Sequence, residues 1–214
     1  MRRVATTIAV VVVLAAVCLI WNACRTAVPV TSQQVDAVTK DLSPWVDAKQ
    51  LQEPERKALG DFCRFLATRR WCDDEITSKR MTDEAAVKLT QPMLDKVVKD
   101  GKPAEDVLIR LLDKRKGLDA KKRNDTLLKE DPEIYATIIL WNMKSKRAVP
   151  LLIELAKDKT IENRAVFVRG LGRIGDPAAL DFLNDVAAKD LSPEVQNEAK
   201  IAIEEIERAN PAAK

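Results

Sequence analysis

The sequence contains no histidine, and this absence excludes several kinds of site. Without an imidazole, the chain cannot build a Ser-His-Asp or Cys-His nucleophile pair, a histidine-bearing zinc site or a histidine general base. Glycine is scarce, with 6 residues. None of them stands in a G-x-x-x-x-G-K-S/T or G-x-G-x-x-G array, so no phosphate-binding loop is visible. We therefore predict no catalytic residue, no metal ligand and no cofactor, and expect that the protein is not an enzyme.

The chain also lacks a strong excess of either charge. It carries 36 Lys and Arg residues against 33 Asp and Glu residues, a formal net charge of +3. Two of the positive residues, Arg2 and Arg3, precede the first apolar run, so the remainder is nearly neutral. A protein whose whole surface binds nucleic acid would be more basic, and we do not expect a nucleic-acid partner. The low aromatic content of 4% and the abundant Ala, Leu, Lys and Glu favour helices.

One long apolar run is present, from Val4 to Trp21, with two threonines as its only polar residues. As a helix it would span about 27 Å, close to the thickness of the hydrocarbon core of a bilayer. Arg2 and Arg3 precede the run, which places the amino terminus in the cytoplasm by the positive-inside rule. Residues 1–24 are therefore predicted to anchor the chain as a single transmembrane helix. The remainder would be extracytoplasmic, or periplasmic in a Gram-negative bacterium.

Two alternatives for residues 1–24 also export the chain. A cleaved signal peptide needs small residues at −3 and −1, but cleavage after Ala23 puts Trp21 at −3. A lipoprotein signal would place small or aliphatic residues before Cys24, where Trp21 and Asn22 stand instead. An uncleaved anchor fits better than either, and a terminal Trp suits the membrane interface.

After the anchor, the pattern predicts a linker and then helices throughout. Residues 25–50 contain two prolines and no sustained period, which indicates a linker with a short helical piece near 35–39. Trp45 is either the first residue to touch the folded domain, which we favour, or an exposed aromatic residue of the linker. Residues 51–131 read as helices over about 53–67, 82–98 and from Pro103 onward. The buried side of the first helix is predicted to comprise Leu59, Phe62, Cys63 and Leu66, and that of the third Val107, Leu108, Leu111 and Leu112. Residues 210–214 are predicted to be a disordered tail.

Residues 132–209 contain an internal repeat. At a shift of 31 residues Leu140 aligns with Leu171 and Leu152 with Leu183, and at a shift of 32 Leu171 aligns with Ile203. Each unit comprises a helix, a short turn and a second helix, and neither helix can bury its apolar stripe alone. The fold class is therefore all-α, a short α-solenoid of helix pairs.

Within the repeat, Arg164 precedes residues 170–177, which read Gly-Leu-Gly-Arg-Ile-Gly-Asp-Pro, and Ala-Ala-Leu follows at 178–180. Gly175 can end a helix in the left-handed conformation, Asp176 can cap the next one, and Pro177 fits its first turn. These residues resemble the HEAT-like repeat of the type found in phycobilin lyases and many bacterial scaffold proteins. The resemblance is specific over about 132–207 and loose over 82–131. In the earlier unit, Lys144-Ser145-Lys146 replaces the Gly-Asp-Pro turn.

The resemblance implies an α-solenoid with a concave face that binds other macromolecules, and it does not imply catalysis. We therefore expect a membrane-anchored scaffold or adaptor that binds a protein partner outside the cytoplasm. Two alternatives stay open on the same fold. One is binding of a tetrapyrrole-like small molecule or a lyase role, and the other is nucleic-acid binding as in HEAT-like DNA-repair proteins.

Three side chains are candidates for partner contact: Trp141, Arg169 and Arg173. Trp141 stands where the next repeat has Gly172, so it either fills a wider helix junction or forms a hot spot on the concave face. Arg169 and Arg173 lie four apart and can bind a carboxylate or phosphate, or pair with acids of an adjacent helix.

Cys63 and Cys72 form a candidate disulfide. In one unbroken helix they would be about 13 Å apart and could not bond, so a bond requires the helix to end near 68–70. The alternative is two reduced, partly buried thiols.

Two groups of charged residues complete the predictions. A basic cluster is either a binding surface for acids or a solvated loop, and it comprises Lys114, Arg115, Lys116, Lys121, Lys122 and Arg123, with Lys144, Lys146 and Arg147 nearby. The last helix, 193–209, is expected to cap the solenoid with an acidic outer side that comprises Glu194, Glu198, Glu204, Glu205 and Glu207.

Overall fold

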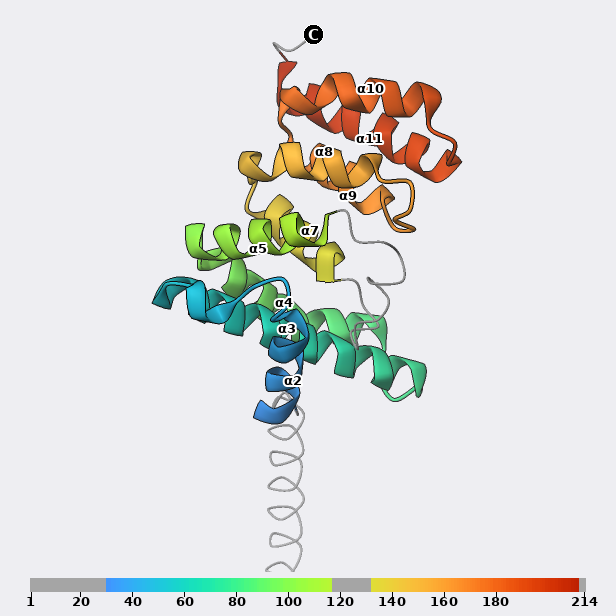
Figure 1. Ribbon diagram of the computed structural model, residues 1–214. Helices are drawn as coiled ribbons and strands as arrows, with labels where there is room; N and C mark the ends of the chain where they lie inside the picture. Colours follow the sequence, from blue (N-terminus) through green and yellow to red (C-terminus); the bar gives the residue numbers. More distant parts are fainter. Residues whose placement is uncertain (1–29, 117–131, 212–214) are drawn as a thin grey trace, which may run out of the picture.

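The computed structural model describes residues 30–116 and 132–211, and every regular element in these ranges is helical. The helices stack in successive layers, from α2 at one end to α10 and α11 at the other (Figure 1). The predicted anchor, the basic residues at 121–123 and residues 212–214 lie outside the described ranges. Within these ranges no helix is both long and apolar enough to cross a bilayer.

Residues 30–116 form four helices and one short 3-10 turn. They are α2 (Ser32–Leu42), η1 (Ala48–Gln50), α3 (Glu53–Thr77), α4 (Asp83–Lys99) and α5 (Lys102–Arg115). Helices α2, α4 and α5 all pack against α3. The buried residues predicted for α3 and α5 are confirmed, since all eight are at most 4% exposed.

The predicted linker is in fact part of the fold from Val30 onward. Thr31 and Gln34 form a capping box that starts α2, and Val38 and Leu42 are buried against α3. Val46, four residues after Leu42, is also buried, so the apolar spacing of α2 extends into the turn that follows it. The prediction of a linker overlooked this spacing because Pro44 interrupts the segment. Trp45 packs partly buried against the core, but it is not the first residue to do so, because Val30, Val35, Val38 and Leu42 precede it there.

Helix α3 is ten residues longer than predicted. The sequence suggested a break near Arg69 and Arg70, but α3 continues to Thr77. Arg69 donates a hydrogen bond to Asp73 one turn later at 2.5 Å, so the charge that interrupts the apolar face is compensated within the helix.

The carboxyl-terminal part consists of helix pairs, as the repeat predicts. Its helices are α7 (Pro132–Asn142), α8 (Val149–Lys157), α9 (Ala165–Ile174), α10 (Leu180–Lys189) and α11 (Pro193–Ala209). Short 3-10 turns, η2 (Lys146–Ala148) and η3 (Pro177–Ala179), lead into α8 and α10. Gly175 ends α9 with φ +80°, and the Asp176 side chain accepts a hydrogen bond from Ala178 N at 3.1 Å. The predicted chemistry of this turn is therefore confirmed, although Asp176 caps η3 and not α10 directly.

The carboxyl-terminal segment is ordered further than predicted. Asn210 Nδ2 donates to Gly175 O and to Ile206 O, both at 2.9 Å. These bonds attach the end of α11 to the end of α9, so residue 210 belongs to the fold and not to a tail.

Candidate partner-binding surface

The first helices of the repeats form one closely packed layer. Helix α7 packs on α9 and α9 packs on α11, whereas α8 and α10 contact each other little. The closest approach is at Gly172, where an added Cβ would lie 2.6 Å from Ala202 Cα. A stack of helix pairs curves toward the side on which its helices lie closer together, and that side becomes the concave one. The layer of α7, α9 and α11 is therefore the inner layer, and α8 and α10 form the outer one.

Trp141 lies at the junction of α7 and α9. It is half-buried against the core, and an added Cβ on Gly170 would lie 3.7 Å from its Cε3 atom. The same Cβ would meet Thr137 Cγ2 at 2.8 Å, so Gly170 lets α7 and the indole ring approach α9. Trp141 therefore fills the helix junction, and part of its ring stays accessible to solvent.

Arg169 and Arg173 both pair with glutamates of α11. Arg169 donates through Nε to Glu198 Oε2 at 2.9 Å and through Nη2 to Glu198 Oε1. Arg173 Nη1 lies 3.4 Å from Glu205 Oε1. The hydrogen bond from Arg169 lowers the pKa of Glu198, although partial burial of the carboxylate acts in the opposite direction. The two arginines therefore tie α9 to α11, which is the pairing that the sequence left open.

In both pairs the cation is on the outside. The Arg169 and Arg173 side chains are about half exposed, whereas Glu198 and Glu205 lie deeper. A guanidinium fixed by one carboxylate in this way still presents its outer edge to solvent. The arrangement can therefore bind a further acceptor without reorganising.

Ile201 completes this surface. It lies on α11 three residues after Glu198 and four before Glu205, on the same side of the helix, and it is 41% exposed. The name inner-layer face is used below for this surface, which comprises Trp141, Arg169, Arg173, Glu198, Ile201 and Glu205.

The expected acidic outer side of α11 is wrong for two of its residues. Glu198 and Glu205 face α9, because the arginines of that helix attract them. Glu194 and Glu204 are exposed, and Glu207 is half-buried. The sequence does contain a hint of this pairing, because two arginines one turn apart on α9 are followed by two glutamates two turns apart on α11. Which glutamate meets which arginine depends, however, on how the two helices stack.

Neither of the two cysteines in the described part of the chain forms a disulfide. Cys63 and Cys72 are buried in the uninterrupted α3, where nine residues separate them by about 13 Å. The disulfide left open by the sequence is therefore absent, because the helix does not end between them. Burial raises the pKa of the Cys63 thiol to about 11, although hydrogen bonding to Thr39 acts against the rise.

The basic cluster is only partly visible. Lys114 is exposed, and Lys116 donates to Glu154 of α8 at 2.6 Å. Lys144 donates to the backbone oxygen of Arg173, which links the α7–α8 turn to the end of α9. Lys116 and Lys144 therefore join neighbouring helices, a structural role that the sequence did not reveal.

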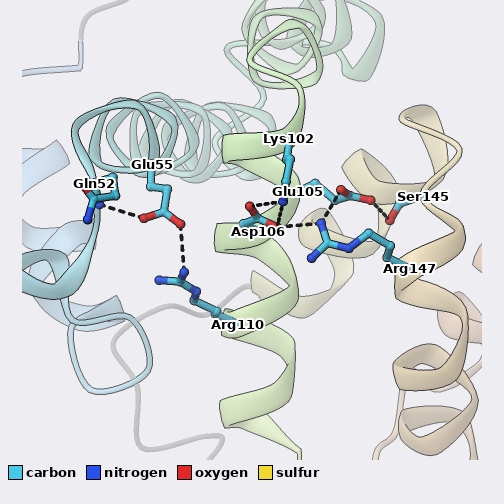
Figure 2. Close-up of polar contacts among 8 residues, drawn as sticks. All are labelled: Gln52, Glu55, Lys102, Glu105, Asp106, Arg110, Ser145 and Arg147. Carbon is cyan, nitrogen blue, oxygen red and sulfur yellow. Dashed lines mark hydrogen bonds and ion pairs between the residues drawn. The ribbon is translucent and has the colours of Figure 1, made fainter.

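A polar network on α5 was missed from the sequence (Figure 2). Glu105 accepts from Ser145 Oγ at 2.5 Å and from Arg147 Nη1 at 2.7 Å, and Asp106 accepts from the same Nη1 at 2.6 Å. The network thus joins α5 to the α7–α8 turn. Partial burial opposes the charge of Asp106, but hydrogen bonds from Lys102 and Arg147 lower its pKa overall.

A separate ion pair joins α5 to α3. Arg110 lies 2.9 Å from Glu55 Oε1, and Glu55 Oε2 accepts from the backbone of Gln52 at the start of that helix (Figure 2). Helix α5 therefore connects the amino-terminal helices to the repeats through side chains on both of its flanks. Only the structure brings these residues together, since more than 35 positions separate Glu105 from its partners Ser145 and Arg147.

Comparison with known families agrees with the repeat. The family model of HEAT repeats matches residues 127–204, which include α7 to α10 and most of α11. No curated protein and no solved structure gives a significant match to the chain. Residues 127–204 are thus similar to HEAT repeats, and the helix pairs of the described part agree with that similarity. The finer resemblance, to the repeat type of the phycobilin lyases, stays a prediction.

Proposed function

We propose that this protein is a non-catalytic, membrane-anchored scaffold whose HEAT repeats bind a protein partner on the extracytoplasmic side of the membrane. The inner-layer face is the observation that carries the proposal. It combines an aromatic ring and two oriented guanidinium groups, the residue types enriched among the hot spots of protein interfaces, with one exposed aliphatic side chain beside them.

The stacking of the repeats supports the same function. Each helix pair buries its apolar stripe against its neighbours, so the repeats provide a rigid extended surface with the inner-layer face across three helices. A preorganised surface loses little conformational entropy on binding, which favours recognition of a protein.

The amino-terminal sequence supports the anchoring. The apolar run ends at Trp21 and the described fold begins at Val30, so a helical anchor would hold the start of α2 within about 30 Å of its membrane end. Anchoring raises the local concentration of the repeats for any partner at the same membrane. The arginines before the run favour the extracytoplasmic side for the fold.

Crosslinking in intact membranes, followed by affinity purification and mass spectrometry, tests this function. The variant Trp141→Ala with Arg169→Glu alters the inner-layer face. The matched control, Asn184→Ala with Lys189→Glu, makes the same change of charge on the outer layer. We expect one specific protein to be captured by the wild type and the control and lost from the inner-face variant. Equal capture by all three chains, or no specific capture, would contradict the proposal.

A further inference from the structure

A hollow lies where the amino-terminal helices meet the repeats. It is open to solvent, has a volume of about 540 Å³, and is called the junction groove here. The residues that line it include Val98, Lys102, Glu105, Asn142, Met143 and Arg147. They come from the ends of α4 and α7, the start of α5, and the α7–α8 turn, so the groove exists only because α5 packs against the repeats.

The charged side chains of the groove are arranged at two depths. The side chains of Lys102 and Arg147 are 72% and 53% exposed, whereas those of Glu105 and Asp106 are 16% and 20% exposed. The two acids accept hydrogen bonds from Ser145, Lys102 and Arg147 (Figure 2). An incoming group therefore meets the cations first, and the carboxylates beneath them hold Arg147 in place.

The surroundings of the groove continue this pattern. Two further exposed cations stand on the stretches beside it, Lys99 at the end of α4 and Lys146 on the α7–α8 turn. Their neighbours Lys96 and Lys144 are engaged elsewhere, with Asp61 of α3 at 2.7 Å and with the backbone oxygen of Arg173. On the same stretches, Asp95 is exposed and Asp100 is largely buried. Lys99 and Lys146 therefore add positive charge beside the groove, whose own cations are paired with Glu105 and Asp106.

The floor of the groove is apolar. Val98 and Met143 are both partly buried against the hydrophobic core, and their remaining surface faces the hollow. Met is a flexible side chain that adapts to different apolar groups. A planar layer of lipid headgroups would contact the exposed cations but would not reach this floor, whereas a protruding peptide side chain would.

We infer that the junction groove binds a short acidic segment of a protein, with one apolar side chain on Val98 and Met143 and flanking carboxylates on Lys102 and Arg147. The inference rests on the proposed function as a protein scaffold and specifies the chemistry of what it binds. It places this contact on a different surface from the inner-layer face.

The test uses the full-length chain in nanodiscs of zwitterionic lipid and a fluorescein-labelled peptide, Glu-Asp-Leu-Asp-Glu, followed by fluorescence anisotropy. Lys102→Gln with Arg147→Gln removes the two cations of the groove. Arg80→Gln with Lys189→Gln removes two similarly exposed, ion-paired cations elsewhere. We expect the groove variant to bind about tenfold more weakly, and the control variant to bind like the wild type. Replacing the peptide leucine by glycine should weaken binding as well, and added salt should weaken it further.

Three results would overturn the inference. They are absence of peptide binding by the wild type, equal binding by the groove and control variants, and equal binding of the leucine and glycine peptides. Nanodiscs that contain anionic lipid provide a further comparison. If loss of Lys102 and Arg147 weakens association with anionic lipid but not with the peptide, the groove cations face a membrane and the inference is wrong. Capture through the inner-layer face is measured separately, so either proposal can fail without the other.

Discussion

Gly172 of α9 lies so close to Ala202 of α11 that a Cβ atom at position 172 would stand 2.6 Å from the Ala202 Cα. The same Cβ would lie 2.7 Å from the Ala202 Cβ. Helices α9 and α11 of the inner layer therefore meet backbone to backbone, and this contact sets how the last repeat stacks.

Gly172→Ala is expected to destabilise the protein by about 2 kcal/mol, because a backbone atom cannot move aside as a flexible side chain can. Thermal unfolding of the full-length chain in detergent measures the effect. Gly60→Ala in α3 is the matched control, since nothing lies within 4 Å of its added Cβ. It should raise stability by about 0.5–1 kcal/mol through helix propensity. If both variants changed stability in the same direction, the close contact would not exist in solution.

The start of α9 and the end of α10 are joined by Arg164 and Asp190, which form two hydrogen bonds of 2.6 Å and are almost fully buried. Asp190→Asn should lower the free energy of unfolding by about 3 kcal/mol at pH 7, because it leaves the Arg164 charge without its partner. Denaturant unfolding monitored by circular dichroism measures this loss.

The loss should depend on pH in a defined direction. The hydrogen bonds from Arg164 hold the pKa of Asp190 below its ordinary value, despite partial burial. The stabilisation is therefore complete above the unfolded pKa of about 3.9 and disappears as the pH falls through the lower, folded value. Wild type and Asp190→Asn should become more alike below about pH 4. A difference in stability that stays constant down to pH 2 would contradict this assignment.

The thiols of Cys63 and Cys72 should not react with maleimide in the folded protein at pH 8, because both are fully buried. Substituting Cys18 and Cys24 by serine leaves only these two thiols, and mass spectrometry then counts the labels. Both should react once denaturant is added. A folded chain that labels completely, or an unfolded chain that labels only after reduction, would show that α3 is not continuous between them.

Deletion of residues 191–214 should make the protein aggregate. The deletion removes α11 and uncovers the side of α9 and α10 that packs on Val195, Ala199, Ala202 and Ile206. A chain that ends at Asn210 keeps α11 and is the control. Size-exclusion chromatography distinguishes them, and equal monodispersity of the two chains would mean that α11 is not the cap.

Local sequence features predicted the elements that depend on neighbouring residues. Gly175, Asp176 and Pro177 determine their turn within three positions, and the period of Leu59, Phe62 and Leu66 identifies the buried side of α3. The family match then supports the repeat assignment over 127–204.

Features that depend on packing between distant helices were not predictable in this way. The pairing of Arg169 with Glu198 requires the register of α9 against α11, which Gly172 and Ala202 set by their size. The junction groove requires Glu105 to meet Arg147 across a long separation in sequence. Helix α2 was missed because its apolar residues are few and become a stripe only against α3.

Site-specific photocrosslinking tests the central claim, that the inner layer of the repeats binds a protein partner. A photoreactive residue replaces Ile201 on the inner-layer face, and Asn184, exposed on the outer layer, is the control position. Irradiation of intact membranes should give one discrete crosslinked product from position 201 and none from position 184. The product should disappear when Arg169→Glu is added. Identical products from both positions, or a product at 201 that survives Arg169→Glu, would contradict the account.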